Sequence, residues 1–419
     1  MSGILHGIKS DSPAVTGKVA KQYPWLSDDK HCDVCVIGGG MTGAMCVLSA
    51  AEKGLSAVLI TSGAAGYGNT GHITGCARFD GGRTLSELDR FMTTEDALRL
   101  YSLGFQALDG LQNLCGRLDG AYKQTGVSSG FERRDLLVFT TDPSDLALLE
   151  REYAAVGNKG RDCALITRKT AQSSFEFHVS GGILTTEGSA VLNPYALAHL
   201  CLMRAAELGA EIFEQTEAID IQTPKTEDGC VIVRTSTCRT IYADRLIVAS
   251  GSSGTRILCG RMKKRALFAV IASLPENSPG WSGKCTLGAF GGYSRNVGFF
   301  SEGLVKASGI YKNGTVKSLF RSPAEAMRYR ELNDCIQTVL PEPDRIQIKY
   351  EYSYDFTTAS DGLPIAGRHD AYKNCLFALP GSLSDAGEPV YSYIAAEIAG
   401  NFLENREPEH GSPFDPMRY

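Results

Sequence analysis

The clearest pattern of apolar positions lies between residues 33 and 62. A mostly apolar run at 33–37 leads into a glycine-rich turn and a small-residue apolar stretch that ends at Lys53 and Gly54, and a second apolar run follows at 57–60. Short uninterrupted apolar runs predict buried strands, and the longer stretch that stops at a glycine predicts a helix. The predicted order of strand, turn, helix and strand is typical of a parallel α/β sheet.

Patterns of both periods continue through the rest of the chain. Thr93 and Asp96 predict a capping box at the start of a long amphipathic helix. Further helical patterns lie at 143–157, 195–207, 322–340 and from Pro389 onward. Strand-like runs lie at 135–140, 211–214, 218–222, 231–234, 239–242, 245–250, 266–273, 293–300, 304–311 and 376–379. These elements predict an α/β fold in which a parallel sheet is accompanied by a separate antiparallel sheet.

Length and charge narrow the class of protein. A chain of 419 residues is too long for one ordinary core and suits two domains or two interleaved ones. A formal net charge of −5 gives no basic field for nucleic acid. No window approaches 18 uninterrupted apolar residues, so no membrane span is expected, and residues 1–30 lack the apolar core of a secretory signal. A cytoplasmic protein is therefore expected.

The thirteen cysteines are scattered along the chain. Cys32 and Cys35 have the spacing of a ligand pair, but Cys35 falls inside the first predicted strand, and no second pair stands at ligand spacing. Cys230 and Cys238 could meet across a hairpin, although a reducing compartment favours free thiols. No metal site is expected, and nearly all cysteines are expected to be buried thiols.

The glycine turn after the first strand carries the candidate chemistry. Gly38 permits a tight turn, Gly40 lets the backbone approach a pyrophosphate, and Gly43 lets the helix lie close on the sheet. The N–H groups at the start of the following helix attract phosphates. The pattern therefore predicts a dinucleotide-binding site.

Two nearby features bear on that prediction. Thr61 stands where an acidic residue normally binds the ribose hydroxyls, and a threonine hydroxyl lacks the charge-assisted acceptor of a carboxylate. Residues 63–75 are rich in Gly, Thr and Asn and predict a loop with many exposed backbone donors. The loop either cradles the cofactor or is a flexible connector.

Six segments in order resemble the D-amino-acid-oxidase-like family of FAD-dependent oxidoreductases, which includes glycine oxidase, sarcosine oxidase and γ-glutamylputrescine oxidase. They are DVCVIGGGMTG, GYGNTGHITG, LNPYALAHLCLMRAAELGAEIFEQTEAI, LIVASGSSG, SDGLPIAG and GSLSDAGEPVYSYIAAEIAG. The resemblance implies a Rossmann-like FAD-binding domain interleaved with an antiparallel-sheet α+β substrate domain. The FAD-binding domain would comprise residues 1–85, 180–262 and 352–419, and the substrate domain residues 86–179 and 263–351.

The resemblance also implies which residues border FAD. Those expected near the pyrophosphate and the adenosine are Gly38, Gly39, Gly40, Met41, Thr42, Gly43, Thr61, Ser62 and Ala218, with Ala249, Ser250 and Gly251 close to the cofactor. Those expected near the ribityl chain and the flavin are Gly68, Asn69, Thr70, Gly71, Asp361, Gly362, Leu363, Pro364, Gly387 and Glu388. The N-terminus of the last helix is expected to stabilise reduced flavin, an effect that a charge on Glu388 opposes.

The family reaction implied is oxidation of the C–N bond of a small-molecule amine or amino acid, with hydride transfer to flavin N5. His72 is a candidate near the flavin, and Tyr293 and Arg295 are candidates for binding a substrate carboxylate. Each has an ordinary structural alternative as a packing or solvated residue. A non-catalytic binding or assembly module with the same fold, motivated by Thr61 and Glu388, and an NAD-dependent dehydrogenase are the competing hypotheses. Substrate identity, the electron acceptor and the oligomeric state stay open.

Overall fold

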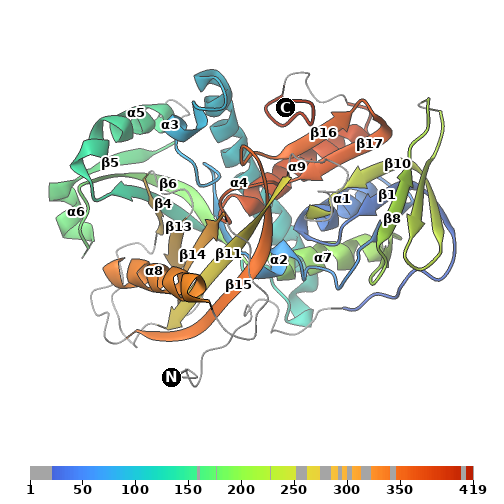
Figure 1. Cartoon of the computed structure of the whole chain (residues 1–419), viewed down its shortest axis with the longest axis horizontal. Coiled ribbons are helices and arrows are strands. Elements are labelled where there is room, and N and C mark those ends of the chain that lie inside the picture. Colours follow the sequence, from blue (N-terminus) through green and yellow to red (C-terminus); the bar gives the residue numbers. More distant parts are fainter. Residues whose placement is uncertain are drawn as a thin grey trace.

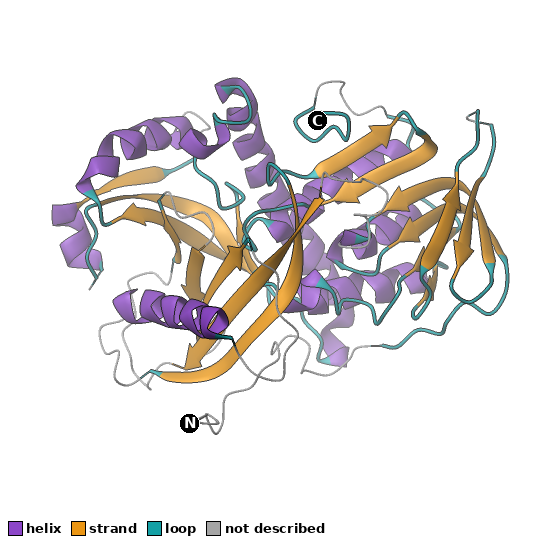
Figure 2. Cartoon of the chain, in the orientation of Figure 1, coloured by secondary structure: helices purple, strands orange, loops and turns teal. Residues whose placement is uncertain are grey.

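The computed structural model describes residues 21–157, 161–175, 177–226, 228–251, 262–273, 285–290, 295–299, 304–312, 322–339, 346–406 and 412–418. Its strands form two sheets, which lie in different halves of the molecule (Figure 1). Helices α4 (Thr94–Tyr122) and α9 (Glu388–Leu403) lie in the middle between the two groups of strands (Figure 2). The predicted α/β class with two interleaved sheets is confirmed.

The first sheet has a parallel centre. Its strands are β1 (Lys30–Ile37), β2 (Ala57–Ile60), β7 (Glu211–Phe213), β8 (Ala218–Gln222), β9 (Val231–Thr235), β10 (Thr240–Val248), β16 (Ile365–His369) and β17 (Tyr372–Leu379). They run in the order β16-β17-β10-β1-β2-β7, with β9 also paired to β10 and β8 to β9. β1 pairs in parallel with both β2 and β10, and β10 pairs in parallel with β17.

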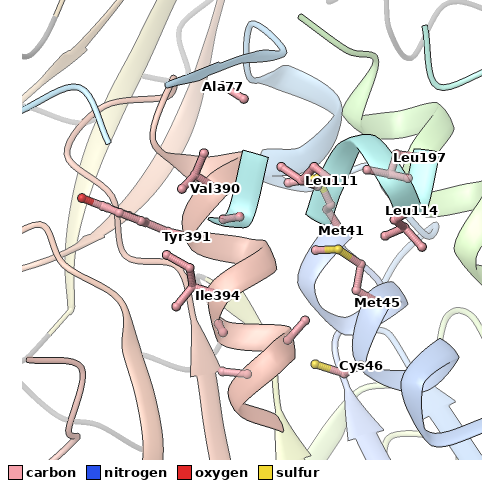
Figure 3. Packing of buried hydrophobic residues seen from close by; sticks show 14 of the residues in the cluster. Met41, Met45, Cys46, Ala77, Leu111, Leu114, Leu197, Val390, Tyr391 and Ile394 are labelled. Carbon is pink, nitrogen blue, oxygen red and sulfur yellow. The ribbon is translucent and has the colours of Figure 1, made fainter. Parts of the chain in front are cut away.

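Both faces of this sheet are buried, which explains the continuous apolar runs of its strands. Val34 and Val36 of β1 face one core cluster, and Cys35 and Ile37 face another. Helix α1 (Met41–Glu52) packs on α7 (Pro194–Glu207) and α9 over the first face. Met41, Met45 and Val390 are among the side chains that meet there (Figure 3). The glycine turn between β1 and α1 therefore stands at the carboxyl edge of a sheet that is buried on both faces at β1.

The second sheet is mostly antiparallel. Its strands are β3 (Cys76–Arg78), β4 (Glu132–Thr140), β5 (Cys163–Thr167), β6 (Gly181–Val191), β11 (Met262–Ser273), β12 (Thr286–Ala289), β13 (Arg295–Phe299), β14 (Leu304–Tyr311) and β15 (Gln347–Ala359). They run in the order β15-β11-β14-β13-β12-β4-β6-β3, with β5 paired to β6. Helix α8 (Pro323–Val339) covers one face with Tyr329, Leu332 and Ile336. The remaining short elements are α2 (Asn69–His72), α3 (Leu85–Leu88), α5 (Leu146–Gly157), α6 (Arg168–Ser174), η1 (Lys123–Thr125) and η2 (Pro143–Asp145).

Three of the elements predicted from the sequence can be compared directly with the observed helices and strands. The N-cap half of the predicted capping box is present at the start of α4, because the Asp96 N–H donates to Thr93 Oγ1 over 3.2 Å. The Asp96 carboxylate accepts a hydrogen bond of 2.7 Å from the Thr93 hydroxyl. Residues 63–75 are not wholly a loop, since they contain the short helix α2. The runs predicted as separate strands at 239–242 and 245–250 are one strand, β10.

The domain boundaries stay a prediction. Strands β3 and β6 lie within the ranges expected for the FAD-binding domain, yet they hydrogen-bond in the second sheet. A division by sheets would therefore move both strands to the other domain. Among the helices that the structure describes, none is both long and apolar enough to cross a membrane.

Candidate dinucleotide site

A cavity of about 720 Å³ opens at the carboxyl ends of the parallel strands. This is the edge at which open α/β sheets bind ligands, and the volume lies in the range of small-molecule sites. Its lining begins at the glycine turn and runs past Ala218 of β8 on one side and Glu388 of α9 on another. Among the described residues that line it, Lys264 is the one cation, whereas Glu217, Asp220 and Glu388 are acidic types. Within the described lining, the main groups that attract an anionic ligand are therefore backbone N–H groups and helix dipoles.

The glycine turn has the geometry that the motif predicts. Gly38 has φ +122°, a conformation that L side chains rarely adopt, and a Cβ there would lie 2.3 Å from the carbonyl oxygen of Ala249. A Cβ on Gly43 would lie 1.9 Å from the carbonyl oxygen of Gly38. Both neighbours are backbone atoms, which cannot rotate away. The two glycines are thus required for close packing of the turn, β10 and α1.

Gly40 has a different neighbour within the protein. A Cβ on Gly40 would lie 3.0 Å from Thr70 Oγ1, and the same oxygen accepts a hydrogen bond of 2.9 Å from the Met41 N–H. The Thr70 hydroxyl therefore satisfies one of the first-turn donors of α1. Because of this bond, the 63–75 segment is fixed against the start of α1.

Thr61 lies directly after β2 and lines the cavity, as the comparison with the dinucleotide motif predicts. Its N–H donates to the Phe213 carbonyl over 3.0 Å, so the backbone is held by the neighbouring strand. Its methyl group packs against Gly39, where an added Cβ would approach Thr61 Cγ2 to 2.9 Å. The side chain is half-buried at the rim and can reach a ligand in the cavity.

The structure brings most of the predicted cofactor residues together. Those that line the cavity are Gly38, Gly39, Gly40, Met41, Thr42, Thr61, Ser62, Gly68, Asn69, Thr70, Ala218, Ala249, Ser250, Gly251 and Glu388. Those that do not line it are Gly43, Gly71, Asp361, Gly362, Leu363, Pro364 and Gly387. Their roles toward a cofactor stay predictions.

The segment 361–364 is held by the end of the chain. Arg418 Nε donates to Asp361 Oδ2 over 2.9 Å and Arg418 Nη2 donates to Asp361 Oδ1 over 3.1 Å. Arg418 Nη2 also donates to the Leu363 carbonyl over 3.2 Å, and Arg83 Nη1 donates to the Asp361 carbonyl. Asp361 thus acts in this structure as an anchor for its own loop.

His72 lies at the end of α2 within an aromatic cluster. Its ring stacks on Tyr354 with 3.8 Å between the centroids and meets the edge of Tyr67 at 5.5 Å, and His72 Nδ1 lies 2.9 Å from the Gly68 carbonyl oxygen. Tyr67 and Tyr354 line the cavity, whereas His72 does not. The ring therefore supports the two tyrosines, which favours its packing interpretation.

Tyr293 and Arg295 are the two candidates in the predicted substrate domain. Tyr293 lies outside the described residues. The backbone of Arg295 lies in β13, opposite Gly309 of β14. Both stay predictions.

Glu388 differs from its expected behaviour. The side chain is 5% exposed, and this burial raises the pKa of its carboxyl group to about 8. The group is therefore mainly neutral at pH 7. Burial therefore reduces the negative charge expected at the N-terminus of α9, which weakens the opposition inferred from the sequence.

Sequence reasoning missed several groups near this end of the cavity. Tyr354 belongs to no motif, and it lines the cavity from β15, a strand of the second sheet. Lys306 of β14 is buried, and burial lowers the pKa of its ammonium group to about 7. Its Nζ donates to the Ile73 carbonyl over 3.3 Å. The sequence did contain a signal for Lys306, because this lysine stands inside the otherwise mostly apolar run 304–311.

No group of three or more His, Cys, Asp or Glu side chains able to hold a metal occurs in the described part of the chain. The twelve cysteines described there are free thiols, and most of them are buried. Cys230 and Cys238 are exposed and not joined to each other.

Comparison of the sequence with known proteins identifies oxidoreductases. A sequence model described as "FAD dependent oxidoreductase" (DAO) matches residues 33–382. A probable oxidoreductase, OrdL, of Haemophilus influenzae is 26% identical over 234 residues, which are 55% of this chain and 51% of OrdL. The chain thus matches about half the length of this curated relative.

Two solved structures are similar over nearly their whole length. Glycine oxidase from Geobacillus kaustophilus has a TM-score of 0.75 at 20% identity, covering 93% of this chain and 99% of the oxidase. L-proline dehydrogenase from P. horikoshii has a TM-score of 0.73 at 16% identity, covering 94% and 98%. At these low sequence identities, the similarity of the structures establishes the fold alone.

Proposed function

This chain belongs to the DAO family of FAD-dependent oxidoreductases, and we propose that it binds FAD and oxidises a C–N bond of a small amine or amino acid. The observation that carries the proposal is the cavity that joins the glycine turn, the segment 66–70 and the start of α9. The names of the similar structures, glycine oxidase and L-proline dehydrogenase, are those of enzymes that oxidise amino acids. They support this substrate class.

The residues present fit FAD. Gly38, Gly39 and Gly40 line the cavity and carry no side chains, so a ligand can approach the backbone of the turn closely. The start of α1 carries no acidic side chain in its first turn, so its N–H groups can receive phosphate without repulsion. Thr61 and Ser62 at the rim would hydrogen-bond the adenosine ribose. Of the residues expected to border the flavin, Gly68, Asn69, Thr70 and Glu388 line the cavity.

FAD, when bound, supplies the electron chemistry by accepting a hydride at N5 from the carbon beside a neutral amine. The protein supplies shape and electrostatics. The aromatic pair Tyr67 and Tyr354 presents ring surface to the cavity and would help exclude water from the reacting carbon. The N-terminus of α9 offers positive potential to developing negative charge. Arg295 and Tyr293 are proposed to orient a substrate carboxylate, and His72 to hold Tyr354 in place.

The test is an absorption spectrum of the purified protein, followed by anaerobic addition of amines and amino acids. We expect a yellow protein whose flavin band is bleached by some member of the panel. A yellow protein that no amine or amino acid bleaches would count against C–N oxidation. A colourless protein that cannot be reconstituted with FAD would favour a binding or assembly module, and binding of free NAD(H) without FAD would favour a dehydrogenase.

A further inference from the structure

Glu388 is a buried acidic residue that lines the cavity. It is the first residue of α9, a helix of 16 residues whose N-cap is Gly387. The side chain lines the cavity and is nevertheless 5% exposed. A carboxyl group that lines a cavity from within the protein faces the ligand and is largely removed from solvent.

The hydrogen bonds of this carboxyl group are incomplete. The side chain of Asn69 and the backbone of Ser382 hydrogen-bond the group. Within the described residues, Oε2 is buried and has no hydrogen-bond partner. A buried polar atom without a partner is costly in a folded protein, which is why most such atoms are paired. The remaining partner of Oε2 is therefore expected to be a ligand in the cavity.

The surroundings favour the protonated form of the group. Burial raises the pKa of the Glu388 carboxyl, and the nearby Asp385 raises it further. Asp385 itself accepts hydrogen bonds from Ser308 Oγ over 3.0 Å and the Thr74 N–H over 3.2 Å. Further titratable groups around this end of α9 include Lys306, Cys76, Tyr391 and the ion pair of Arg78 and Asp80. Of these, Lys306 interacts with Asp385.

We propose that Glu388 binds the cofactor as a neutral carboxylic acid, with Oε2–H donating a hydrogen bond to an acceptor atom at the flavin end of FAD. The inference rests on the proposed binding of FAD. Asn69, the hydrogen-bonding neighbour of Glu388, belongs to the segment expected to border the flavin. A neutral donor also agrees with the helix N-terminus, since both stabilise negative charge on the ligand. A carboxylate at the same place would repel that charge.

The proposal predicts a pH dependence of FAD binding that belongs to one residue. FAD is titrated into the apoprotein and the dissociation constant is measured by fluorescence quenching from about pH 6 to about pH 9.5. For the natural chain we expect affinity to fall above about pH 8, by at most about tenfold per pH unit, the limit for one linked proton. Glu388→Gln keeps a neutral donor and should bind with a flat profile. Glu388→Ala should bind about two- to tenfold more weakly at pH 7.

Glu397→Gln is the matched control, because Glu397 is an exposed carboxylate on the same helix. This variant should reproduce the profile of the natural chain. If the natural chain and Glu388→Gln have the same pH profile, the proposal is wrong. If the natural chain binds no FAD at any pH, the proposed function fails instead, so the two failures are distinguishable.

Infrared spectroscopy gives a second measurement, taken as the difference between the natural chain and Glu388→Gln, because burial also raises the pKa of Glu152 to about 7 and that group adds its own protonated band. With ¹³C-labelled glutamate, the apoprotein at pH 7 should show the carbonyl band of a protonated carboxyl group. The band should shift to lower frequency when FAD is added, because the group then donates a hydrogen bond. Absence of a protonated band, or a band unmoved by FAD, would overturn the proposal.

Discussion

Replacing Thr61 by glutamate tests whether the adenosine ribose lies at the end of β2. The side chain is half-buried at the cavity rim, so an added carboxylate stays partly hydrated and avoids a large burial penalty. A hydrogen bond to a charged group contributes about 1.5–3 kcal/mol, and one between neutral groups about 0.5–1.5 kcal/mol. The net gain is therefore about 1–1.5 kcal/mol, which is roughly fivefold to tenfold in affinity.

The assay is FAD titration of the apoprotein at pH 7, followed by fluorescence. Thr61→Gln is the control, since it adds similar length without charge and should change the affinity by less than about twofold. Glu217 and Asp220 also line the cavity, and they set an upper limit on the gain through like-charge repulsion. Unchanged or weaker binding by Thr61→Glu would show that the ribose does not lie there.

Three further predictions concern close packing, a buried ion pair and a buried carboxyl group. Gly43→Ala places a Cβ 1.9 Å from the Gly38 carbonyl oxygen and should destabilise the fold by about 1–3 kcal/mol, with loss of FAD binding. The control Gly116→Ala lies in open space on α4 and should be neutral in urea unfolding or stabilising by up to about 1 kcal/mol. Equal effects of the two variants would refute the close-packing argument. Arg418→Ala should lower the free energy of unfolding by about 2 kcal/mol, because Asp361 then lacks its two guanidinium hydrogen bonds. The control Arg151→Ala breaks a more exposed ion pair with Asp89 and should lower it by under about 1 kcal/mol. Similar decreases for the two variants would contradict an anchoring role for Arg418. Burial raises the pKa of Glu152 to about 7, so as the pH rises the folded protein keeps this proton after the unfolded chain has released it. The contribution of Glu152 therefore makes the free energy of unfolding decrease between pH 4.5 and about pH 7. Glu152→Gln should lack that part of the decrease, and parallel curves for both proteins in urea unfolding at the two pH values would speak against it.

The order of elements around the glycine turn was predictable because local sequence determines it. Strands buried on both faces must be apolar throughout, and Gly38 and Gly43 are needed by the backbone itself. β10 shows the limit of this reasoning. Asp244 and Arg245 interrupt the apolar pattern, yet the strand continues through them because β1 pairs along its length.

The features that depend on distant parts of the chain were not predictable. Helix α2 has the sequence Asn-Thr-Gly-His, which has low helix propensity, and contacts such as the Thr70–Met41 hydrogen bond hold it. Asp361 followed the motif expected beside the flavin, but Arg418, 57 residues away, binds its carboxylate. The protonation of Glu388 likewise depends on burial that only the tertiary structure creates.

The strand order of the first sheet has a consequence for synthesis of the protein. β1 and the glycine turn leave the ribosome early, whereas their parallel partner β10, its neighbour β17 and the covering helix α9 come much later. The cavity wall therefore stays open until α9 has been translated, and β1 lacks its partner β10 for much of synthesis. Chaperones protect nascent chains in this situation. FAD loading is accordingly expected only after α9 has emerged, so ribosome-bound chains that stop before residue 388 should retain no FAD.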